Sequence, residues 1–418
     1  MRIKDIGSIN ARVLGEDTPR NYSFQYIDIG SVSSDGSISL GEPMTYEESP
    51  SRARRIVKKD DVLVSTVRTY LRAIAGIDWD AKDVIASTGF AVITPGKKFE
   101  PSYIKYLLTS NSIVDRICEE STGVSYPAIS SSKLSSICIP ETTKEKQKEI
   151  VTFLDHQIKS ITKRIWLRER ELQTLIKLKQ SEIDAVVTRG LNPNVKMKDS
   201  GIEWIGQIPE HWKTIRLKDI SFMYSGLTGK AGDDFRCEDI SMTKPFIPFT
   251  NILNNTVVDF DSFKQVVISD DEDQNKVREN DILFLMSSED YESIGKTAIV
   301  VGDPGEVYLN SFCRGLRIMN HKDVYPKFVN YLLSSDKYRD ALRFEARGFT
   351  RINLKIDKIS SLSIVLPPIK EQKAIVDFID TQYAKIDAIV SNINQQIEKL
   401  KILKKSLINE VITGQRAI

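Results

Sequence analysis

Two segments of the chain carry apolar residues at the spacing of a long helix. Neither 144–189 nor 370–413 contains proline or glycine, and apolar residues recur there mostly at steps of three and four, which is typical of a coiled-coil seam. Either helix would extend about 68 Å at about 1.5 Å per residue, too far for the interior of one domain. The predicted seam positions are Ile150, Leu154, Ile161, Ile165 and Leu172 in the first segment and Ile386, Val390, Ile393, Ile397, Leu400 and Leu407 in the second.

The two predicted helices most simply pack on each other. Each follows a globular segment, so an antiparallel pair would relate the two halves of the chain by an approximate two-fold axis. The alternative is that each seam binds a helix of another chain. We expect four parts: a globular part at 1–143, a long helix with its linker at 144–193, a second globular part at 194–368 and a second long helix at 369–418.

Short apolar runs predict strands in both globular parts. Residues 62–67, 90–94 and 297–301 are such runs, and glycine- and proline-containing turns follow the last two. Segments 101–119 and 325–347 are expected to be helices, because each has a proline near its start. The predicted fold class is therefore α+β.

The second half of the chain repeats the first at a constant offset. This offset aligns Gly123 with Gly348 and Gln147 with Gln372, and about 30 % of the positions from 103 to 188 carry the same residue as their counterparts. Upstream of 103 the match is weak and needs gaps. A similar part used twice suggests a shared scaffold, and a divergent part used twice suggests two different recognition surfaces.

Composition narrows the functional classes. The chain has 418 residues, enough for two or three domains, and its net charge of +2 excludes a uniformly basic coat but not a local basic face. No apolar run approaches the ~20 residues of a membrane span, and the N-terminus lacks the apolar core of a signal peptide. The cysteines are widely spaced, which favours buried thiols in a reducing cytoplasm over disulfides or a zinc site: Cys118, Cys138, Cys237 and Cys313.

No catalytic or metal-binding constellation is evident, so we expect a chain that is not an enzyme and holds no metal. The segment 290–297 ends like a phosphate loop, but Asp290 stands where that loop needs glycine. The sequence Asn192-Pro193-Asn194 lacks the aromatic residue and second proline of an adenine-methyltransferase motif. The three histidines are isolated, and no serine lies in a G-x-S-x-G motif.

Two basic clusters are candidates for DNA contact. One lies between 52 and 72, and the other lies on a predicted helix, where steps of four would place three arginines on one face. Guanidinium groups suit both phosphates and guanine edges, whereas the alternative is a solvated face paired with nearby acids. The candidate DNA-binding residues are Arg52, Arg54, Arg55, Lys58, Arg68, Arg72 and Tyr126 in the first half and Arg339, Arg343, Arg347, Arg351 and Lys355 in the second.

The whole pattern resembles the DNA-specificity subunits of type I restriction-modification systems, in which two variable globular parts are each followed by a similar long helix. The resemblance is carried by 366–380 (LPPIKEQKAIVDFID), by 147–155 (QKEIVTFLD) and by 199–212 (DSGIEWIGQIPEHW), which looks like the start of a target-recognition domain. The helix ends at 181–190 and 406–414 are also similar. The first half departs from the pattern, because it lacks that tryptophan-containing lead-in and has one proline before its helix.

The resemblance implies a subunit that is not itself catalytic. Each globular part would read one half of a bipartite, asymmetric DNA target, and the helices would set the spacer and dock the partners. Those partners would be two methyltransferase (modification) subunits, which bind S-adenosylmethionine and methylate adenine at N6, and two restriction/translocase subunits. ATP and Mg²⁺ would be used by the partner subunits, and the assembly would defend a cell against foreign DNA in the cytoplasm.

Two other functional classes are open on the sequence alone. A repeat-built coiled-coil scaffold could bind proteins without any role on DNA, and its binding would lack the steep salt dependence of phosphate contacts. An enzyme with an unrecognised active site would reveal itself by turnover in the isolated chain. When partner subunits are absent, the exposed helix seams could pair two copies into a homodimer.

Overall fold

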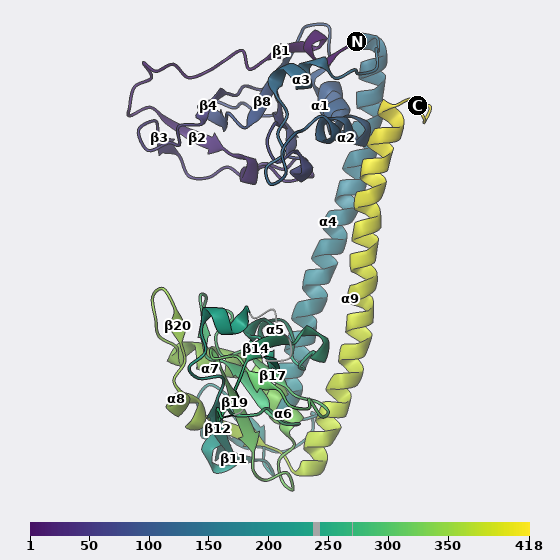
Figure 1. Ribbon diagram of the computed structural model, residues 1–418. Helices are drawn as coiled ribbons and strands as arrows, with labels where there is room; N and C mark the ends of the chain where they lie inside the picture. The colour runs from purple at the N-terminus through teal and green to yellow at the C-terminus, as the bar shows by residue number, and fades with distance from the viewer. Residues whose placement is uncertain (237–242, 270) are drawn as a thin grey trace. The chain divides into compact units, whose positions relative to one another are not determined.

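A computed structural model describes residues 1–236, 243–269 and 271–418 of the chain (Figure 1). The chain forms two compact units: unit 1 comprises Met1–Arg170 with Ile393–Ile418, and unit 2 comprises Glu171–Asn392. Each unit therefore combines one globular part with the beginning of one long helix and the end of the other. Cys237 lies outside the described residues.

Unit 1 contains two four-stranded sheets and three short helices before its long helix. The main sheet has the order β1-β8-β5-β6 and is antiparallel throughout, whereas the second, β3-β2-β7-β4, contains the parallel pair β2 and β7. The strands are β1 (Gly7–Ile9), β2 (Ser23–Ile27), β3 (Met44–Thr45), β4 (Ala53–Ile56), β5 (Val62–Ser65), β6 (Ile74–Gly76), β7 (Val84–Ser87) and β8 (Phe90–Pro95); the helices are α1 (Pro101–Thr109), α2 (Asn111–Glu119) and α3 (Ser131–Ser136), with 3-10 turns at Ile3–Asp5, Ile29–Ser31 and Thr69–Leu71.

Unit 2 repeats this plan. Its main sheet has the order β12-β19-β15-β17, and a three-stranded sheet, β14-β13-β18, takes the place of the second sheet. The strands are β9 (Met197–Asp199), β10 (Gln207–Pro209), β11 (Lys213–Arg216), β12 (Ser221–Ser225), β13 (Thr243–Ile247), β14 (Lys264–Val267), β15 (Ile282–Leu285), β16 (Ser287–Ser288), β17 (Thr297–Ile299), β18 (Tyr308–Leu309), β19 (Cys313–Ile318), β20 (Ile352–Asn353) and β21 (Ser363–Leu366); the helices are α5 (Phe249–Asn254), α6 (Pro326–Ser334), α7 (Asp336–Glu345) and α8 (Ile356–Ser360), with 3-10 turns at Leu217–Asp219, Gly232–Phe235 and Phe260–Ser262.

The apolar runs predicted as strands are β5 and β8, the central strands of the main sheet in unit 1, and β17, at the edge of the main sheet in unit 2. Like the central strand β15, they are buried on both faces. Along β5, Val62 and Val64 belong to a core shared with the helices, whereas Leu63 belongs to the core between the two sheets. In β15, Phe284 and Leu285 divide in the same way. A strand covered on both faces has no polar side to show, which explains why these runs are continuously apolar.

The helices of the two units confirm the repeat. The pairs α1 and α6, α2 and α7, and α3 and α8 each begin at equivalent positions of the two halves. The prediction of one helix at 101–119 and one at 325–347 is wrong, because each segment is two helices that meet at Ser110 or Ser335. Both serines have extended backbones, and their hydroxyls donate to the carbonyls of Leu107 and Leu332 at 2.6 Å.

A buried glutamine joins the start of each long helix to the globular part. The side-chain oxygen of Gln147 accepts from the N–H of Glu100 at 2.9 Å, and that of Gln372 accepts from the N–H of Tyr325 at 2.8 Å. The amide nitrogen of Gln372 also donates to the carbonyls of Asp323 and Pro367, both at 2.8 Å. Gln372 thus bonds to main-chain groups just before two helices, α6 and the long helix to which it belongs.

The long helices are α4 (Lys144–Arg189) and α9 (Ile369–Ile412). In unit 1 the beginning of α4, with Leu154, shares a core with the end of α9, with Val411; Figure 1 also shows α1 and α2 beside this part of α4. In unit 2 the end of α4, with Val187, shares a core with the beginning of α9, with Ile375. Within each unit the two helices are therefore antiparallel, as the seam predicted.

The predicted seam positions face away from solvent. Partly covered are Ile165, Leu172, Val390 and Leu400, and buried are Ile150, Leu154, Ile161, Ile386, Ile393, Ile397 and Leu407.

The cysteines only partly match the expectation of buried thiols. Cys313 is buried and burial raises the pKa of its thiol, whereas Cys118 is half-buried and Cys138 is exposed; these three are free. The surrounding chain, not the spacing of the cysteines, decides their exposure.

Among the residues that the structure describes, no helix is both long and apolar enough to cross a bilayer.

Candidate nucleic-acid interface

One corner of the main sheet in unit 2 is built where three backbone segments meet. After β15 the N–H of Met286 donates to the carbonyl of Phe312 at 3.0 Å, and the carbonyl of Met286 accepts from the N–H of Leu354 at 3.0 Å. Strand β16 then pairs with β20, so that Ser287 lies opposite Asn353. We call this arrangement the strand corner, formed in unit 2 by residues 286–288, 312 and 351–354.

Unit 1 has a strand corner with the same hydrogen bonds, formed by residues 66–68, 89 and 126–129. The N–H of Thr66 donates to the carbonyl of Gly89 at 2.8 Å, and the carbonyl of Thr66 accepts from the N–H of Ile129 at 2.8 Å. Val67 bridges to Ala128, as Ser287 does to Asn353. The two corners therefore correspond position by position, although upstream of 103 the sequence match needs gaps.

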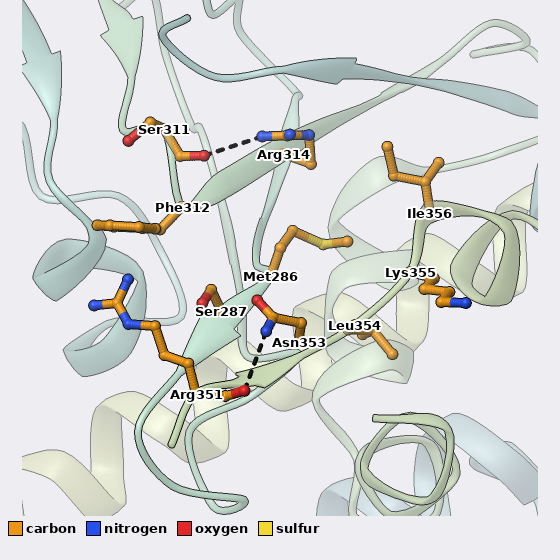
Figure 2. A pocket seen from close by; sticks show the side chains of 10 residues that line it. All are labelled: Met286, Ser287, Ser311, Phe312, Arg314, Arg351, Asn353, Leu354, Lys355 and Ile356. Atoms are coloured by element: carbon orange, nitrogen blue, oxygen red, sulfur yellow. Dashed lines mark hydrogen bonds between the residues drawn. The ribbon is translucent and has the colours of Figure 1, made fainter. Parts of the chain in front are cut away.

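A cleft of about 550 Å³ opens at the strand corner of unit 2. Figure 2 shows its lining, in which the side chain of Arg351 lies against the ring of Phe312. The guanidinium carbon of Arg351 is 4.2 Å from the centre of that ring, close enough for a cation–π contact. The lining residues are Met286, Ser287, Ser311, Phe312, Arg314, Arg351, Asn353, Leu354, Lys355 and Ile356.

The charge of this cleft suits an anion. Three of the ten residues that line it are cations, Arg314, Arg351 and Lys355, and none of these ten is acidic. Arg314 uses one terminal nitrogen for the carbonyls of Ser311 and Cys313, at 3.1 and 2.8 Å, so its position is held by its own strand. A groove with cations and an exposed aromatic ring can bind phosphates and base edges together.

The strand corner of unit 1 carries one stacked cation. The guanidinium carbon of Arg68 lies 4.8 Å from the centre of the Tyr126 ring, and the N–H of Arg68 donates to the carbonyl of Pro127 at 2.7 Å. Both side chains are exposed. Arg72 follows on the same loop, but its guanidinium pairs with Asp115 at 2.6 Å and with Asn111 at 3.2 Å.

The rest of the first basic cluster is divided along β4. The carbonyl of Arg52 accepts from the N–H of Thr88, beside the strand corner, whereas Lys58 lies beyond the other end of the strand. Arg54 stacks on Tyr46 at 5.0 Å, and burial lowers the pKa of Arg55. These residues are close in sequence but do not form one basic patch, because each residue of a strand extends the chain by about 3.3 Å.

The second cluster does not form the predicted helix face. Helix α7 ends at Glu345, so Arg347 lies beyond it and donates to the carbonyls of Phe344 and Ala346. Arg339 is buried and donates to the carbonyls of Ile294 and Glu292, at 2.6 and 2.7 Å. Burial lowers the pKa of Arg339 to about 10, and both of its terminal nitrogens bond within the protein, so this residue does not contribute to the interface.

The remaining arginine of that cluster is engaged in ion pairs. Arg343 contacts the carboxylates of Glu292 and Asp340, at 2.7 and 3.0 Å. The structure therefore brings together Arg351 and Lys355 in unit 2 and Arg68 and Tyr126 in unit 1, out of the twelve residues predicted.

Sequence reasoning missed Phe312 and Arg314. Both lie in the divergent region, where the internal repeat needs gaps and the corresponding residues cannot be assigned. The signal that the sequence offered was an aromatic residue two positions before an arginine.

Comparisons with known proteins identify the family. Residues 1–166 and 209–399 match the family model described as type I restriction modification DNA specificity domain. The putative type I restriction enzyme MjaX specificity subunit of Methanocaldococcus jannaschii is 31% identical over 215 residues, covering 50% of this chain and 47% of that protein. The MjaIX specificity subunit of the same organism is 22% identical over 435 residues, covering 99% and 92%.

Coverage differs among the relatives. The matched stretches span only about half of the MjaX subunit and of the EcoKI specificity subunit of Escherichia coli, at 47% and 44% of their lengths. A solved chain from a study of complex assembly and conformational transition of the type I R-M system shares the fold, with a TM-score of 0.69 at 21% identity, over 99% of this chain and 96% of that one. With the family model matching most of its length, the chain belongs to the family of type I restriction modification DNA specificity domains.

Proposed function

We propose that this chain is the DNA-recognition subunit of a type I restriction-modification complex, and that each globular part reads one half of a bipartite, asymmetric target. One observation carries this proposal: two copies of one scaffold present strand corners with different side chains. In the internal repeat, Arg351 and Lys355 of unit 2 correspond to Tyr126 and Ser130 of unit 1. The same backbone with different side chains is suited to two different half-sites.

The target-recognition domains are 1–143 and 194–368, and the helical segments at 144–193 and 369–418 set the spacer and dock the partners. The partners are two modification subunits and two restriction/translocase subunits. S-adenosylmethionine, ATP and Mg²⁺ are used by those partners, in the cytoplasm, and this chain supplies no catalytic group. The family membership supports this assignment, as do the cations at both corners.

Sequencing of methylated host DNA tests the proposal. A strain that expresses the modification subunits is compared with and without this gene. We expect methyladenine at one split motif to disappear when the gene is deleted, because the modification subunits would lose their only means of choosing a site. An unchanged methylation pattern would contradict the proposal and favour a protein-binding scaffold.

A further inference from the structure

Resting on the proposed function, we propose that Arg68 and Arg351 are the guanine-reading side chains, one for each half-site. Both lie at a strand corner, both are exposed, and both hold the guanidinium group against an aromatic ring. Within the described ranges, no hydrogen-bond acceptor or carboxylate engages either guanidinium group. This combination separates them from the other candidate cations.

Each of the other arginines that stack on rings in the globular parts uses at least one donor within the protein. Arg317 lies over Tyr224 but pairs with Asp281 at 2.7 Å, and Arg347 lies near Phe344 but donates to main-chain carbonyls. Arg54 is half-buried on β4. A guanidinium group with a nitrogen already bonded within the protein has fewer orientations in which two parallel N–H groups reach a guanine edge.

The two strand corners build their stacked pairs from different positions. In unit 2 the arginine comes from the loop before β20 and stacks on Phe312. The position that corresponds to Arg351 in unit 1 is Tyr126, and the position that corresponds to Phe312 is Gly89. A Cβ added at Gly89 would lie 2.9 and 3.0 Å from side-chain carbons of Ile29 and Val67, so a ring at this position would require those side chains to move.

In unit 1 the arginine–ring pair is formed by residues at other positions of the corner. Its ring is Tyr126 itself, and its arginine comes from the opposite segment, at Arg68, where unit 2 has Ser288. Arg68 has a backbone φ of 51°, a left-handed conformation that is uncommon for a side chain of this size. Two divergent sequences that reach the same arrangement by different residues indicate a shared requirement of the corner.

Stacking suits an arginine to base reading. The ring restricts the rotamers of a flexible side chain before DNA arrives, which reduces the ordering cost of binding. The N–H groups at the edge of the guanidinium plane stay free, and arginine bonded to the O6 and N7 atoms of guanine is the commonest specific contact in the major groove. A phosphate contact would need charge but not this geometry.

The test is the methylation motif of the full chain, co-expressed with its modification subunits in a host that lacks other adenine methylation. The variants are Arg351→Ala, Arg351→Lys, Arg68→Ala and Arg68→Lys. We expect both Arg351 variants to lose a guanine preference of about 5- to 150-fold at one position of one half-site. Both Arg68 variants should do the same in the other half-site only.

Lysine keeps the charge but lacks the planar pair of N–H donors, so it tests the geometry of the contact, whereas alanine removes the contact altogether. An alanine variant that keeps the wild-type motif would overturn the proposal. So would a uniform loss of methylation at all sites with an unchanged motif. A wild-type chain that gives no split motif would instead overturn the proposed function.

Ring variants add a second measurement. Phe312→Leu and Tyr126→Leu leave the arginines in place, so the same bases should be read with a weaker preference in the corresponding half-site. An unaltered preference would show that the ring does not position the arginine. Size-exclusion chromatography of each complex confirms assembly, which we expect to persist because the altered side chains are exposed.

Discussion

At the residue scale, burial decides what a charged group does. Arg339 and Arg343 were predicted together from their spacing, yet one guanidinium is enclosed and bonds to carbonyls while the other joins two carboxylates near the surface. Side chains three or four positions apart share a helix face, but the surface against which that face packs is set by the rest of the fold.

Arg339→Met should destabilise unit 2 by about 1–3 kcal/mol, because the carbonyl of Ile294 would lose its side-chain donor and that of Glu292 would keep only Arg343, at 3.4 Å. Arg343→Met is the matched control and should cost at most about 1 kcal/mol, since exposed ion pairs contribute little. Urea unfolding of the full chain measures both. Equal costs for the two variants would contradict the distinction between them.

A half-buried acid near the end of α4 makes stability depend on pH. Asp184 accepts from the N–H of Asp336, at the start of α7, at 2.8 Å, and burial raises the pKa of its carboxyl to about 6. The carboxyl of an unfolded aspartate has a pKa of about 4. Between this pKa and that of the folded chain, the folded chain therefore binds the proton more tightly. The ionised form is therefore the less stable one, and stability falls as pH rises through this window.

Asp184→Asn should flatten this dependence and raise the urea midpoint above wild type at about pH 7.5. In unit 1 an asparagine already makes this kind of hydrogen bond: Asn409 is at the equivalent position of the repeat and accepts from the N–H of Ser112 at 3.0 Å. The reverse variant, Asn409→Asp, should introduce a similar dependence in unit 1. Parallel pH profiles for Asp184→Asn and wild type would contradict the argument.

At the element scale, both units keep a buried aspartate beside a strand but pair it with an arginine from a different segment. Asp61 and Asp281 are buried at the start of β5 and β15 and accept from the backbone N–H groups of Lys58 and Arg278, at 2.7 and 2.8 Å. The arginine that neutralises each comes from a different place: Arg12 in unit 1 and Arg317 in unit 2. A buried carboxylate needs a cation, but several positions can supply it.

The glutamines at the start of the long helices also hold elements together, because each bonds to main-chain groups of the globular part. Gln372→Ala should lower the free energy of unfolding by about 1–3 kcal/mol, because the N–H of Tyr325 and two carbonyls would lose their partner in a buried site. Gln395→Ala, on an exposed part of α9, is the control and should be near neutral. Thermal unfolding compares them; a stable Gln372→Ala chain would contradict this role.

At the scale of the whole molecule, the proposed function implies that two recognition parts joined by long helices gain selectivity only when the spacing of the target fits. Modules of moderate selectivity multiply their effect through a high effective concentration, and a rigid connection narrows the accepted spacers. The proposed function therefore makes the helices a determinant of specificity even though they read no base.

Four residues inserted in α4 between Leu172 and Leu175 add about one helical turn. We expect a longer preferred spacer in the methylated motif, or loss of assembly if the seam with α9 is broken. The control inserts four residues after Asn194, outside both long helices, and should leave the spacer unchanged. An α4 insertion that assembles and keeps the original spacer would refute the role of the helices.

Much of the fold could be read from the sequence because its signals are local or repeated. A periodic apolar seam without proline or glycine predicts the long helices. Short apolar runs predict the strands β5, β8 and β17. The internal repeat placed matching helices in both halves. The breaks at Ser110 and Ser335 were missed, since serine is compatible with a helix and only the packing shows the turn.

The candidate interface was only partly predictable. Arg68, Tyr126, Arg351 and Lys355 were among the candidates because of their charge or their place in the repeat, but nothing in their spacing separated them from Arg339 or Arg72. Their distinguishing property is what lies beside them: a ring, an acid or a buried carbonyl.

The sequence by itself determined the class of fold, the internal repeat and the family, because these depend on periodicity and on residues close along the chain. The tertiary structure decided which cations remain available, since that depends on contacts between segments far apart, such as Arg72 with Asp115 and Met286 with Phe312. It also revealed that the two strand corners build an arginine–ring pair from different positions. An alignment of the two halves does not reveal this, because the backbone is preserved while the arginine and the ring lie at positions that do not correspond.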